Sequence, residues 1–486
     1  MEYFSWEGVL ALILGGLYGC IFGAIPGLTA TLAVALFIPI AFFLDPIIAL
    51  PAIIAISSVA IYAGDVGSSI ARIPGTPASA AYLEELFSIS RKKGPLYGLG
   101  ISAMGSAIGG IIGTLLLIFG ATAIASLAKQ FSSFEYFWVA ILGLTAGVFA
   151  SGGSSLKALA SLLLGILFST VGIDPTLGFP RFHFDNPNLL GGLNYIVAMI
   201  GLFGFAEVIE HLYAGRKNVE AVNTPKGSAV QQFYIAPLLF IIKEKWIVVR
   251  SSFAGIVVGL LPGAGADIGS WVATSIQKMN TKVGDKKAED KAVLAGTCSN
   301  NAAVASAWIP ALSLGLPGDT ITAIVLGVFM MKGITPGPLL FEQEPALLWS
   351  LYITFILANI VLLPVFGFLT ARIAATLIKV PFSILLTAIS AICIVGAYAI
   401  NNSLFDVWVM LTMGVIAFVL RRGDFPLAQV VLGMVLGPIL EQNFMVSAIK
   451  SRWDMASFFE RPVALILMGL TLAIIFVGIR LKRNWQ

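Results

Sequence analysis

A helix-breaking motif occurs twice in this chain, each time within sequence apolar enough to lie in a membrane. The first copy holds Gly19, Gly23, Pro26 and Gly27, and the second, 236 residues later, holds Gly255, Gly259, Pro262 and Gly263. Proline lacks a backbone N–H and glycine weakens a helix, so each copy leaves backbone polar groups without partners. Because hydrocarbon cannot satisfy these groups, a broken helix persists in a membrane only where it lines a cavity. The motif therefore predicts a membrane protein built from two copies of one unit around a cavity.

A second pair of breaks supports the duplication. Pro74-Gly75 returns 243 residues later as Pro317-Gly318. The chain has five Pro-Gly dipeptides, which begin at residues 26, 74, 262, 317 and 336, and four of them fall into these two pairs. Chance is the alternative, because glycine and proline are frequent in membrane helices. Breaks at matching positions of two halves are the sequence feature that best locates the binding site of a transporter.

The composition places the whole chain in a membrane. Hydrophobic residues make up 58% of the 486 positions and charged residues only 11%. We therefore expect an all-α polytopic membrane protein. The 29 Lys and Arg against 25 Asp and Glu suit loops that face a cytoplasm and do not indicate a nucleic-acid partner. Arg72 is the first basic residue, so no charged region precedes the first apolar run and no cleaved signal peptide is expected.

The sequence does not predict an enzyme. The two histidines (His183, His211) and three cysteines (Cys20, Cys298, Cys393) show no metal-ligand or catalytic spacing. An intramembrane hydrolase, the alternative from another class, would need a nucleophile and a base, and the sequence shows no such set. We therefore expect a carrier that has no cofactor and for which Na⁺ is the only metal ion to consider.

The two predicted repeats share one plan. Repeat one covers residues 1–215, an inter-repeat linker follows at 216–245, and repeat two covers 246–486. Each repeat has a hairpin (8–44; 246–277), a helix broken at a Pro-Gly motif (46–90, interrupted at 64–78; 292–331), and closing helices. Each hairpin arm is about 17 residues long, so a rise of ~1.5 Å per residue leaves spanning and re-entrant arms both open.

The loop charges predict opposite orientations for the two repeats. Glu7 and Asp45 flank the first hairpin, whereas Lys245 precedes the second hairpin and Lys282 follows it. Since basic loops stay in the cytoplasm, the first hairpin opens outside and the second opens inside. Arg480 favours a cytoplasmic C-terminus for the same reason. Two repeats of inverted topology are typical of secondary transporters and disfavour a passive channel.

Four ionisable residues lie close to a Pro-Gly break, and an ionisable residue within a membrane segment suggests a function. They are Asp65, Arg72, Asp267 and Asp319. Asp267 would coordinate a cation or cap the second arm of its hairpin, and Asp319 would serve the site or only cap a half-helix that begins near Thr320. Arg72 would form a bidentate pair with a substrate carboxylate, or an internal ion pair with Asp65.

Residues beside the breaks supply the candidate site. Half-helix N-termini attract carboxylates, and freed carbonyl groups can bind Na⁺. The predicted substrate-binding residues are Pro26, Gly27, Thr29, Ser69, Arg72, Pro74, Gly75, Thr76, Pro262, Gly263, Pro317, Gly318 and Thr320. The predicted ion-coupling residues are Asp65, Asp267, Ser299, Asn300, Asn301 and Asp319. For the small and hydroxyl residues, including the cavity candidate Thr31, ordinary helix packing is the alternative.

Five stretches in both predicted repeats carry a family resemblance. They are GCIFGAIPGLTATLAVALFIP (19–39), YAGDVGSSIARIPGTPASAA (62–81), GLLPGAGADIGSWV (259–272), SNNAAVASAWIPALSLGLPGD (299–319) and MMKGITPGPLLF (330–341). They resemble the large membrane subunit of the tripartite tricarboxylate transporter family, and length and hydropathy agree along essentially the whole chain. The resemblance implies kinship with inverted-repeat carriers that move by an elevator-like mechanism.

The same resemblance implies a function and partners. The chain would be the large permease subunit of a secondary active, binding-protein-dependent system in the prokaryotic cytoplasmic (inner) membrane. Its partners would be a periplasmic or extracellular solute-binding protein, a small four-helix membrane subunit and a small organic di- or tricarboxylic acid. Uptake would use a Na⁺ or H⁺ gradient, and the sequence leaves the ion and the oligomeric state open. The alternative is a carrier that takes up another small organic anion without a binding protein.

The reversed loop charges lead to a labelling test. On a cysteine-free background, a thiol at position 45 should react with an impermeant reagent added outside, and a thiol at position 285 only with reagent added from the cytoplasmic side. Labelling of intact cells and of inverted vesicles measures both accessibilities. Reaction of both thiols from the same face would refute the inverted repeat.

Overall fold

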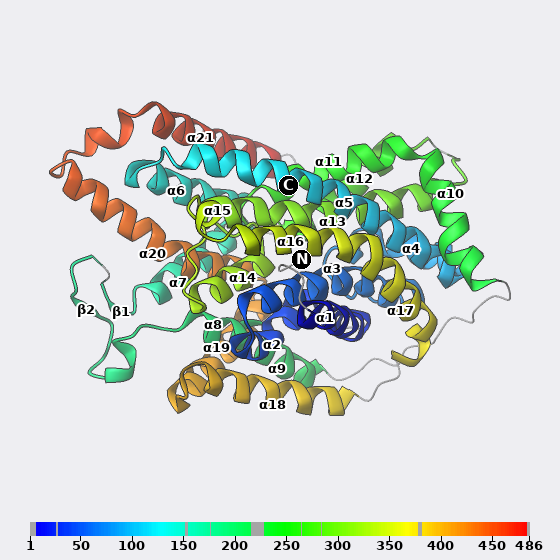
Figure 1. Cartoon of the computed structure of the whole chain (residues 1–486), viewed down its shortest axis with the longest axis horizontal. Coiled ribbons are helices and arrows are strands. Elements are labelled where there is room, and N and C mark those ends of the chain that lie inside the picture. The colour runs from blue at the N-terminus through cyan, green and yellow to red at the C-terminus, as the bar shows by residue number, and fades with distance from the viewer. Residues whose placement is uncertain are drawn as a thin grey trace.

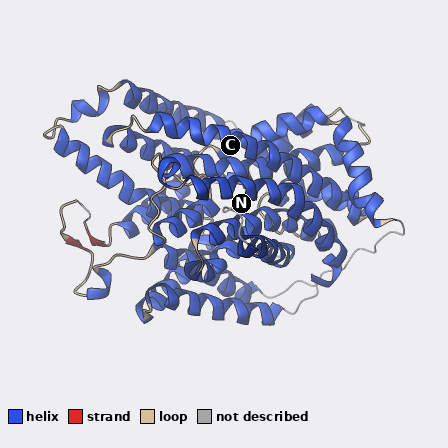
Figure 2. Cartoon of the chain, viewed as in Figure 1, coloured by secondary structure: helices blue, strands red, loops and turns tan. Residues whose placement is uncertain are grey.

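The computed structural model describes residues 6–25, 28–150, 154–174, 176–214, 228–263, 265–282, 284–377 and 382–483, and most of them are helical (Figure 1). Within this part of the chain, eight helices are long and apolar enough to cross a membrane, and five shorter apolar helices accompany them. The expected polytopic helical membrane protein is confirmed. The described residues also include one antiparallel pair of two-residue strands, β1 (Gly172–Ile173) and β2 (Pro180–Arg181), in a projecting loop (Figure 2).

The first hairpin and its broken helix lie close to their predicted positions. The elements are α1 (Trp6–Ala24), α2 (Ala30–Phe43), α3 (Pro46–Ala71), the 3-10 turn η1 (Ser79–Tyr82) and α4 (Leu83–Lys93). Thr29 caps α2, because its hydroxyl accepts a hydrogen bond from Leu32 N at 3.1 Å. The interruption is shorter than the sequence predicts, since α3 stays helical through Gly64 and ends only at Ala71.

The second half repeats this order of elements. Its hairpin consists of α11 (Lys245–Gly259) and α12 (Gly265–Asn280), and its broken helix of α13 (Ala288–Leu314) and α14 (Thr320–Met331). Gly315 follows α13 in the left-handed region at φ 71°, and Arg72 follows α3 in the same region at φ 55°. Such a residue ends a helix and turns the chain, at little steric cost for glycine and at a higher cost for arginine.

Further helices follow the broken helix in each half. In the first half they are α5 (Pro95–Ala128), α6 (Ser133–Ala150), α7 (Ser155–Ser169), the 3-10 turn η2 (Pro187–Leu189), α8 (Tyr195–Met199), the π-helical η3 (Ile200–Phe205) and α9 (Ala206–Ala214). In the second half they are α15 (Leu340–Gln343), α16 (Pro345–Leu357), the π-helical η5 (Ala358–Leu362), α17 (Leu363–Leu377), α18 (Phe382–Asn401), α19 (Leu404–Arg422), α20 (Leu427–Lys450), η6 (Met455–Phe459) and α21 (Pro462–Arg483). Two further elements, the π-helical η4 (Gln231–Ile235) and α10 (Ala236–Lys243), fall within the predicted linker, so its second part is helical.

The glycines of the repeated motif bring each hairpin close to the following helix. A Cβ at Gly19 would lie 2.7 Å from the Ile56 carbonyl oxygen of α3, and a Cβ at Gly255 would overlap the Ser299 carbonyl oxygen of α13. Ser299 follows Ile56 by 243 residues, the offset that separates the Pro-Gly dipeptides of the two broken helices. The motif therefore makes equivalent helix contacts in both halves, in keeping with close approach of membrane helices at small residues.

After each break the chain folds back along the helix that it has just left. Gly75 N donates to Gly64 O at 3.2 Å, so the loop after α3 returns by about two turns of that helix. In the second half Gly318 lies against Ala307, because a Cβ at Gly318 would be 2.6 Å from the Ala307 carbonyl oxygen. In each half the helix therefore extends beyond the level at which its Pro-Gly residues lie. The return loop brings the residues after Pro-Gly back into the interior.

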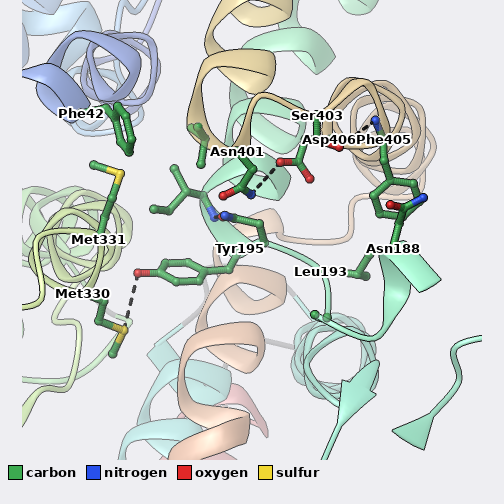
Figure 3. A pocket seen from close by; sticks show the side chains of 15 residues that line it. Phe42, Asn188, Leu193, Tyr195, Met330, Met331, Asn401, Ser403, Phe405 and Asp406 are labelled. Carbon is green, nitrogen blue, oxygen red and sulfur yellow. Dashed lines mark hydrogen bonds between the residues drawn. The ribbon is translucent and has the colours of Figure 1, made fainter. Parts of the chain in front are cut away.

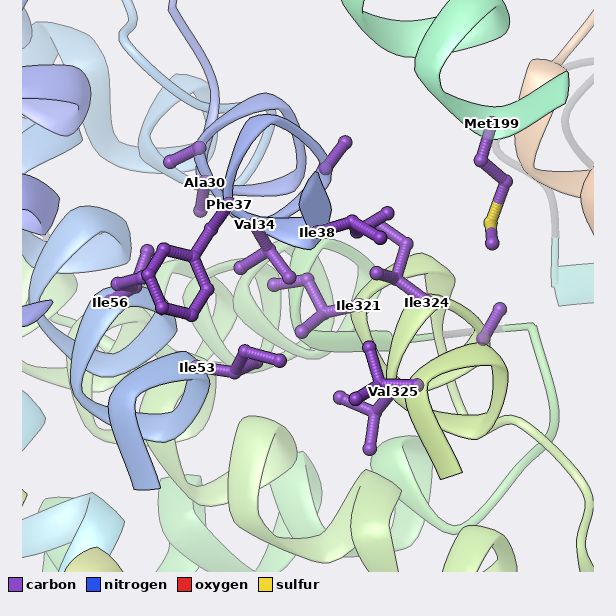
Figure 4. Close-up of a cluster of buried hydrophobic side chains, with 14 of the residues drawn as sticks. Ala30, Val34, Phe37, Ile38, Ile53, Ile56, Met199, Ile321, Ile324 and Val325 are labelled. Atoms are coloured by element: carbon purple, nitrogen blue, oxygen red, sulfur yellow. The ribbon is translucent and has the colours of Figure 1, made fainter. Parts of the chain in front are cut away.

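A central apolar layer joins α2 and α14 to their neighbours. It contains Ala30, Val34, Phe37 and Ile38 of α2, Ile53 and Ile56 of α3, Ile321, Ile324 and Val325 of α14, and Met199 of α8 (Figure 4). These side chains are buried and carry no polar atom other than the methionine sulfur. The layer therefore holds α2 and α14 against each other by burial of apolar surface and by dispersion.

The glycine contacts lead to a stability test. Gly255→Ala should lower the free energy of unfolding by about 1–3 kcal/mol, because the new methyl group overlaps the Ser299 backbone. Gly469→Ala on α21 is the matched control, since no atom lies within 4 Å of a Cβ at Gly469. Thermal unfolding in detergent should show a lower midpoint for the first variant and an unchanged or higher midpoint for the second. Equal midpoints would contradict the packing role of the motif.

Candidate functional site

The breaks of both halves meet at one small cavity of about 80 Å³. Its lining residues come from the two hairpins, both broken helices and the start of α20: Thr29, Ala30, Thr31, Ile61, Thr76, Pro77, Gly263, Gly265, Ala266, Asp267, Asp319, Thr320, Ile321 and Ala428. Six predicted site residues, namely Thr29, Thr76, Gly263, Asp267, Asp319 and Thr320, are among them. Pro26 and Gly27 lie outside the described residues. The cavity is smaller than the pockets of about 300–1,000 Å³ that usually hold small molecules.

Hydrogen bonds across the cavity tie the hairpin of each half to the break of the other. The Thr31 and Thr320 hydroxyls lie 3.2 Å apart, and Asp267 Oδ1 accepts a hydrogen bond from Ala78 N at 3.1 Å. Thr31 is the fifth residue after Pro26, as Asp267 is after Pro262, so the two contacts occupy equivalent positions. Each hairpin tip therefore satisfies polar groups that the opposite break leaves free.

Two further contacts strengthen the second of these links. Ser270 Oγ donates to Ala78 O at 3.0 Å, and Trp271 Nε1 donates to Pro77 O at 3.1 Å. Together with Asp267 they hold the return loop of α3 against the first turns of α12. The expectation that Asp267 caps its own helix is wrong, because Asp267 already lies within the first turn of α12 and its described hydrogen-bond partner is Ala78.

Asp319 does cap a helix, as one of the two readings of the sequence has it. Its Oδ1 accepts a hydrogen bond from Thr322 N at 2.7 Å, and the Thr322 hydroxyl oxygen accepts one from Asp319 N at 2.8 Å. These two bonds form a capping box for α14. This cap does not exclude a site role, because Asp319 also lines the cavity. A Cβ at Gly265 would lie 2.8 Å from the Asp319 Cβ, so only glycine lets the second hairpin approach this residue.

The cavity is chemically asymmetric. The first half contributes the hydroxyls of Thr29, Thr31 and Thr76, and the second half contributes the carboxyl groups of Asp267 and Asp319 together with Thr320. The lining residues include no Lys, Arg or His. Oxygen atoms of carboxylates, hydroxyls and backbone carbonyls are the ligands of hard cations. The site is therefore suited to a cation or to a ligand that arrives with one.

Arg72 lies away from this cavity. Its side chain is 58% exposed, and its Nη2 forms an ion pair with Glu84 Oε2 of α4 at 2.8 Å. The alternative of an internal ion pair with Asp65 is wrong, because seven residues of helix separate the two by about 10 Å along α3. The left-handed backbone at Arg72 then turns the chain toward α4, where Glu84 is in reach.

The remaining predicted residues are near the breaks but are not among the residues that line the cavity. Ser69 Oγ and Ser90 Oγ lie 2.6 Å apart, and Ser299 Oγ donates to Gly269 O at 2.7 Å, so both serines join neighbouring elements. Asn300 and Asn301 are buried on α13, and neither Oδ1 atom has a hydrogen-bond partner among the described residues. The predicted prolines and glycines that do not line the cavity are Pro74, Gly75, Pro262, Pro317 and Gly318. Asp65 is buried behind the cavity, where it accepts from Tyr82 Oη at 2.8 Å.

Sequence reasoning missed several lining positions. Ile61, Pro77, Gly265, Ala266, Ile321 and Ala428 are too ordinary in type to stand out, although Pro77 and Gly265 adjoin recognised breaks. Thr31 was considered only as one of many hydroxyl residues. Its position five residues after Pro26, equivalent to that of Asp267, is the signal that would have singled it out.

A second, larger cavity of about 690 Å³ was not predicted at all (Figure 3). It lies between the ends of α2 and α14 and the α18–α19 turn, and Tyr195 at the start of α8 points across it toward Met330. Asn401 Nδ2 donates to Asp406 Oδ2 at 2.7 Å in its wall. Sequence reasoning had no signal for it, because its residues come from loops and helix ends that are far apart in the chain.

Comparisons with known proteins identify the family of this chain. The model of the tripartite tricarboxylate transporter TctA family matches residues 9–432. The uncharacterized 52.8 kDa protein of the TAR-I ttuC' 3' region of Agrobacterium vitis is 31% identical over 486 residues, which cover 97% of this chain and 94% of that protein. An uncharacterized protein of the TAR-II ttuC' 3' region of the same organism is 33% identical over 240 residues, 47% of this chain and 97% of that protein. No solved structure matches this chain. Since the family model spans most of its length, the protein belongs to the tripartite tricarboxylate transporter TctA family.

Proposed function

We propose that this chain is the large permease subunit of a tripartite secondary transporter that takes up small organic di- or tricarboxylates with a Na⁺ or H⁺ gradient. The observation that carries the proposal is the cavity at which the breaks of both halves meet. Freed backbone groups at broken helices are the usual means by which secondary carriers bind substrate and coupling ion near the bilayer midplane. Family membership supports the transport role.

The charges at the cavity support coupling to a cation. A carboxylate substrate would be repelled by Asp267 and Asp319, since the lining residues carry no basic group. A cation or proton that enters with the substrate offsets this negative charge, so we expect uptake of an anion to require a coupling ion. We assign the substrate carboxylates to the threonine hydroxyls and the α14 N-terminus. The ion-coupling candidates are the three aspartates, Ser299 and the Asn300-Asn301 pair behind them.

The proposed repeats are residues 1–215 and 246–486, joined by 216–245 and inverted relative to each other. Their equivalent glycine contacts and the equivalent positions of Thr31 and Asp267 support this division. We further propose an elevator-type movement. The central apolar layer supports it, because α2 and α14 meet α8, η3, α18 and α20 largely through aliphatic side chains that can slide past one another.

The proposed partners are a solute-binding protein, which would deliver the carboxylate from outside the prokaryotic inner membrane, and a small four-helix membrane subunit. The family belongs to tripartite systems, which supports both. The alternative is a carrier that takes up another small organic anion without a binding protein. Uptake by the membrane subunits alone would favour this alternative.

A reconstitution experiment tests the proposal. The chain, its co-encoded small subunit and its binding protein are assayed in proteoliposomes with radiolabelled citrate, malate and succinate. Accumulation of at least one acid should require the binding protein and should rise with an inward Na⁺ gradient or with an acidic exterior, because the coupling ion offsets the charge of the two aspartates. Uptake that ignores both gradients would overturn the coupling, and the absence of uptake of any carboxylate would overturn the substrate class.

A substitution tests the place of Arg72. Because its guanidinium is exposed and pairs with Glu84, Arg72→Lys should keep uptake within a few-fold of the wild type. Glu84→Gln is the matched control, since it removes the same ion pair from the other side. Severe loss of uptake in Arg72→Lys, together with normal uptake in Glu84→Gln, would restore the original prediction that Arg72 binds a substrate carboxylate.

A further inference from the structure

Asp65 is a buried carboxyl group that does not line the cavity. Only 1% of the residue is exposed. Tyr82 Oη donates to its Oδ1 at 2.8 Å, and Ser102 Oγ donates to its Oδ2. These partners come from η1 and α5, and both are neutral hydroxyl groups. No Lys, Arg or His of the described chain contacts the carboxyl group of Asp65.

Two other deeply buried carboxylates of this protein have a cation beside them. Glu135, also 1% exposed, pairs with Arg461 at 2.6 Å, and Asp290, 2% exposed, pairs with Lys93 at 2.6 Å. A carboxylate that is buried without such a partner is costly and usually avoids the cost by binding a proton. Asp65 therefore differs from Glu135 in its partners although it is buried to the same extent.

The groups that face Asp65 from the neighbouring elements do not replace a cation. The titratable groups in electrostatic contact with this cluster are Tyr82 of η1, Tyr62 of α3, Cys20 of α1, Tyr234 of η4 and Asp267 of α12. Tyr62 Oη already donates to Gly367 O of α17 at 3.0 Å. Each of these groups is neutral or negative, so none favours a charged Asp65.

We infer that Asp65 is the proton-binding site of the transport cycle and that Tyr82 transmits its protonation to the broken helix. The inference rests on the proposed function and specifies its coupling ion. The step is the binding of one proton by a carboxylate to give a carboxylic acid. Ionised Asp65 accepts hydrogen bonds from both hydroxyls, whereas protonated Asp65 must donate to one of them. Proton binding therefore changes the hydrogen bonding of Tyr82 or Ser102.

Tyr82 is placed to pass this change on to the cavity. It is the last residue of η1, four residues after Ala78, whose N–H donates to Asp267. Its ring packs so closely on α13 that a Cβ at Gly296 would overlap it. Asn300 hydrogen-bonds the Tyr82 hydroxyl, and its own Oδ1 has no partner among the described residues. The proton site, the return loop and the Asn pair are thus parts of one polar network.

Infrared difference spectroscopy of the purified protein tests the protonation without any substrate. The wild type should show the carbonyl-stretch band of a protonated carboxylic acid near neutral pH, and Asp65→Asn should lack one such band. Glu135→Gln is the matched control and should keep it, because Arg461 holds Glu135 ionised. Tyr82→Phe should shift the band, since it removes one hydroxyl partner and leaves the carboxyl group in place. A band that persists unchanged in Asp65→Asn, or disappears equally in Glu135→Gln, would overturn the assignment.

Transport by the reconstituted complex tests the coupling. The probe is whichever of citrate, malate or succinate the wild type accumulates. Accumulation by Asp65→Asn should no longer respond to an acidic exterior, and exchange of external labelled for internal unlabelled acid should become independent of pH. The Asn amide has N–H donors and a carbonyl acceptor and no charge, and so it imitates the protonated acid. The inference would be refuted if accumulation by this variant still depended on pH. It would also be refuted if accumulation by the wild type were driven by Na⁺ alone. If no acid is taken up by the wild type, the proposed function fails, while the spectroscopic test of Asp65 still stands.

Discussion

The structure depends on how the backbone groups at the breaks are satisfied inside an apolar molecule. Each Pro-Gly motif frees amides and carbonyls that neither lipid nor apolar side chains can accept. Asp267 of the second hairpin satisfies one such group, because it accepts a hydrogen bond from the Ala78 amide after the first break, and the Thr31 and Thr320 hydroxyls join the first hairpin to the second break. These contacts require both hairpins to come within hydrogen-bond distance of the opposite break. Within the second half, Gly265 lets the hairpin lie against Asp319 and Gly318 lets the return loop lie against Ala307.

The groups that line the cavity also form the hydrogen bonds between the hairpins and the breaks. The hydrogen bonds that satisfy the breaks also line the cavity, so a ligand that enters has to replace them or rearrange them. The cavity holds only about 80 Å³, whereas pockets for small molecules measure about 300–1,000 Å³. Under the proposed function the cavity has to widen to hold a carboxylate, and separation of a hairpin from the opposite break would widen it.

The two halves share a backbone plan but differ in charge. At equivalent positions after the hairpin tips the first half has Thr31 and the second has Asp267, and after the breaks Thr76 corresponds to Asp319. The buried Asp65 adds a third acid, away from the cavity and bound only by hydroxyl groups. A symmetric scaffold with asymmetric chemistry gives one molecule both an anion-tolerant wall of hydroxyls and acidic groups that take up positive charge. Such a division suits a carrier whose substrate and coupling ion have opposite charges.

The sequence by itself determined the polytopic helical class, the family resemblance and the approximate position of most helices. Membrane helices of this kind are encoded by local apolar length, and their ends by local proline, glycine and capping residues such as Thr29 and Asp319. Only the tertiary structure decided that Thr31 lies at the cavity, that Arg72 pairs with Glu84 and not with Asp65, and that Tyr82 and Ser102 are the partners of Asp65. The larger cavity beside Tyr195 also belongs to this group. These features depend on contacts between segments far apart in the chain, where the left-handed turn at Arg72 and the return loops set which side chains meet. The periodicity and spacing of residues in a sequence indicate the conformation of one segment. They do not indicate which face of another segment packs against it.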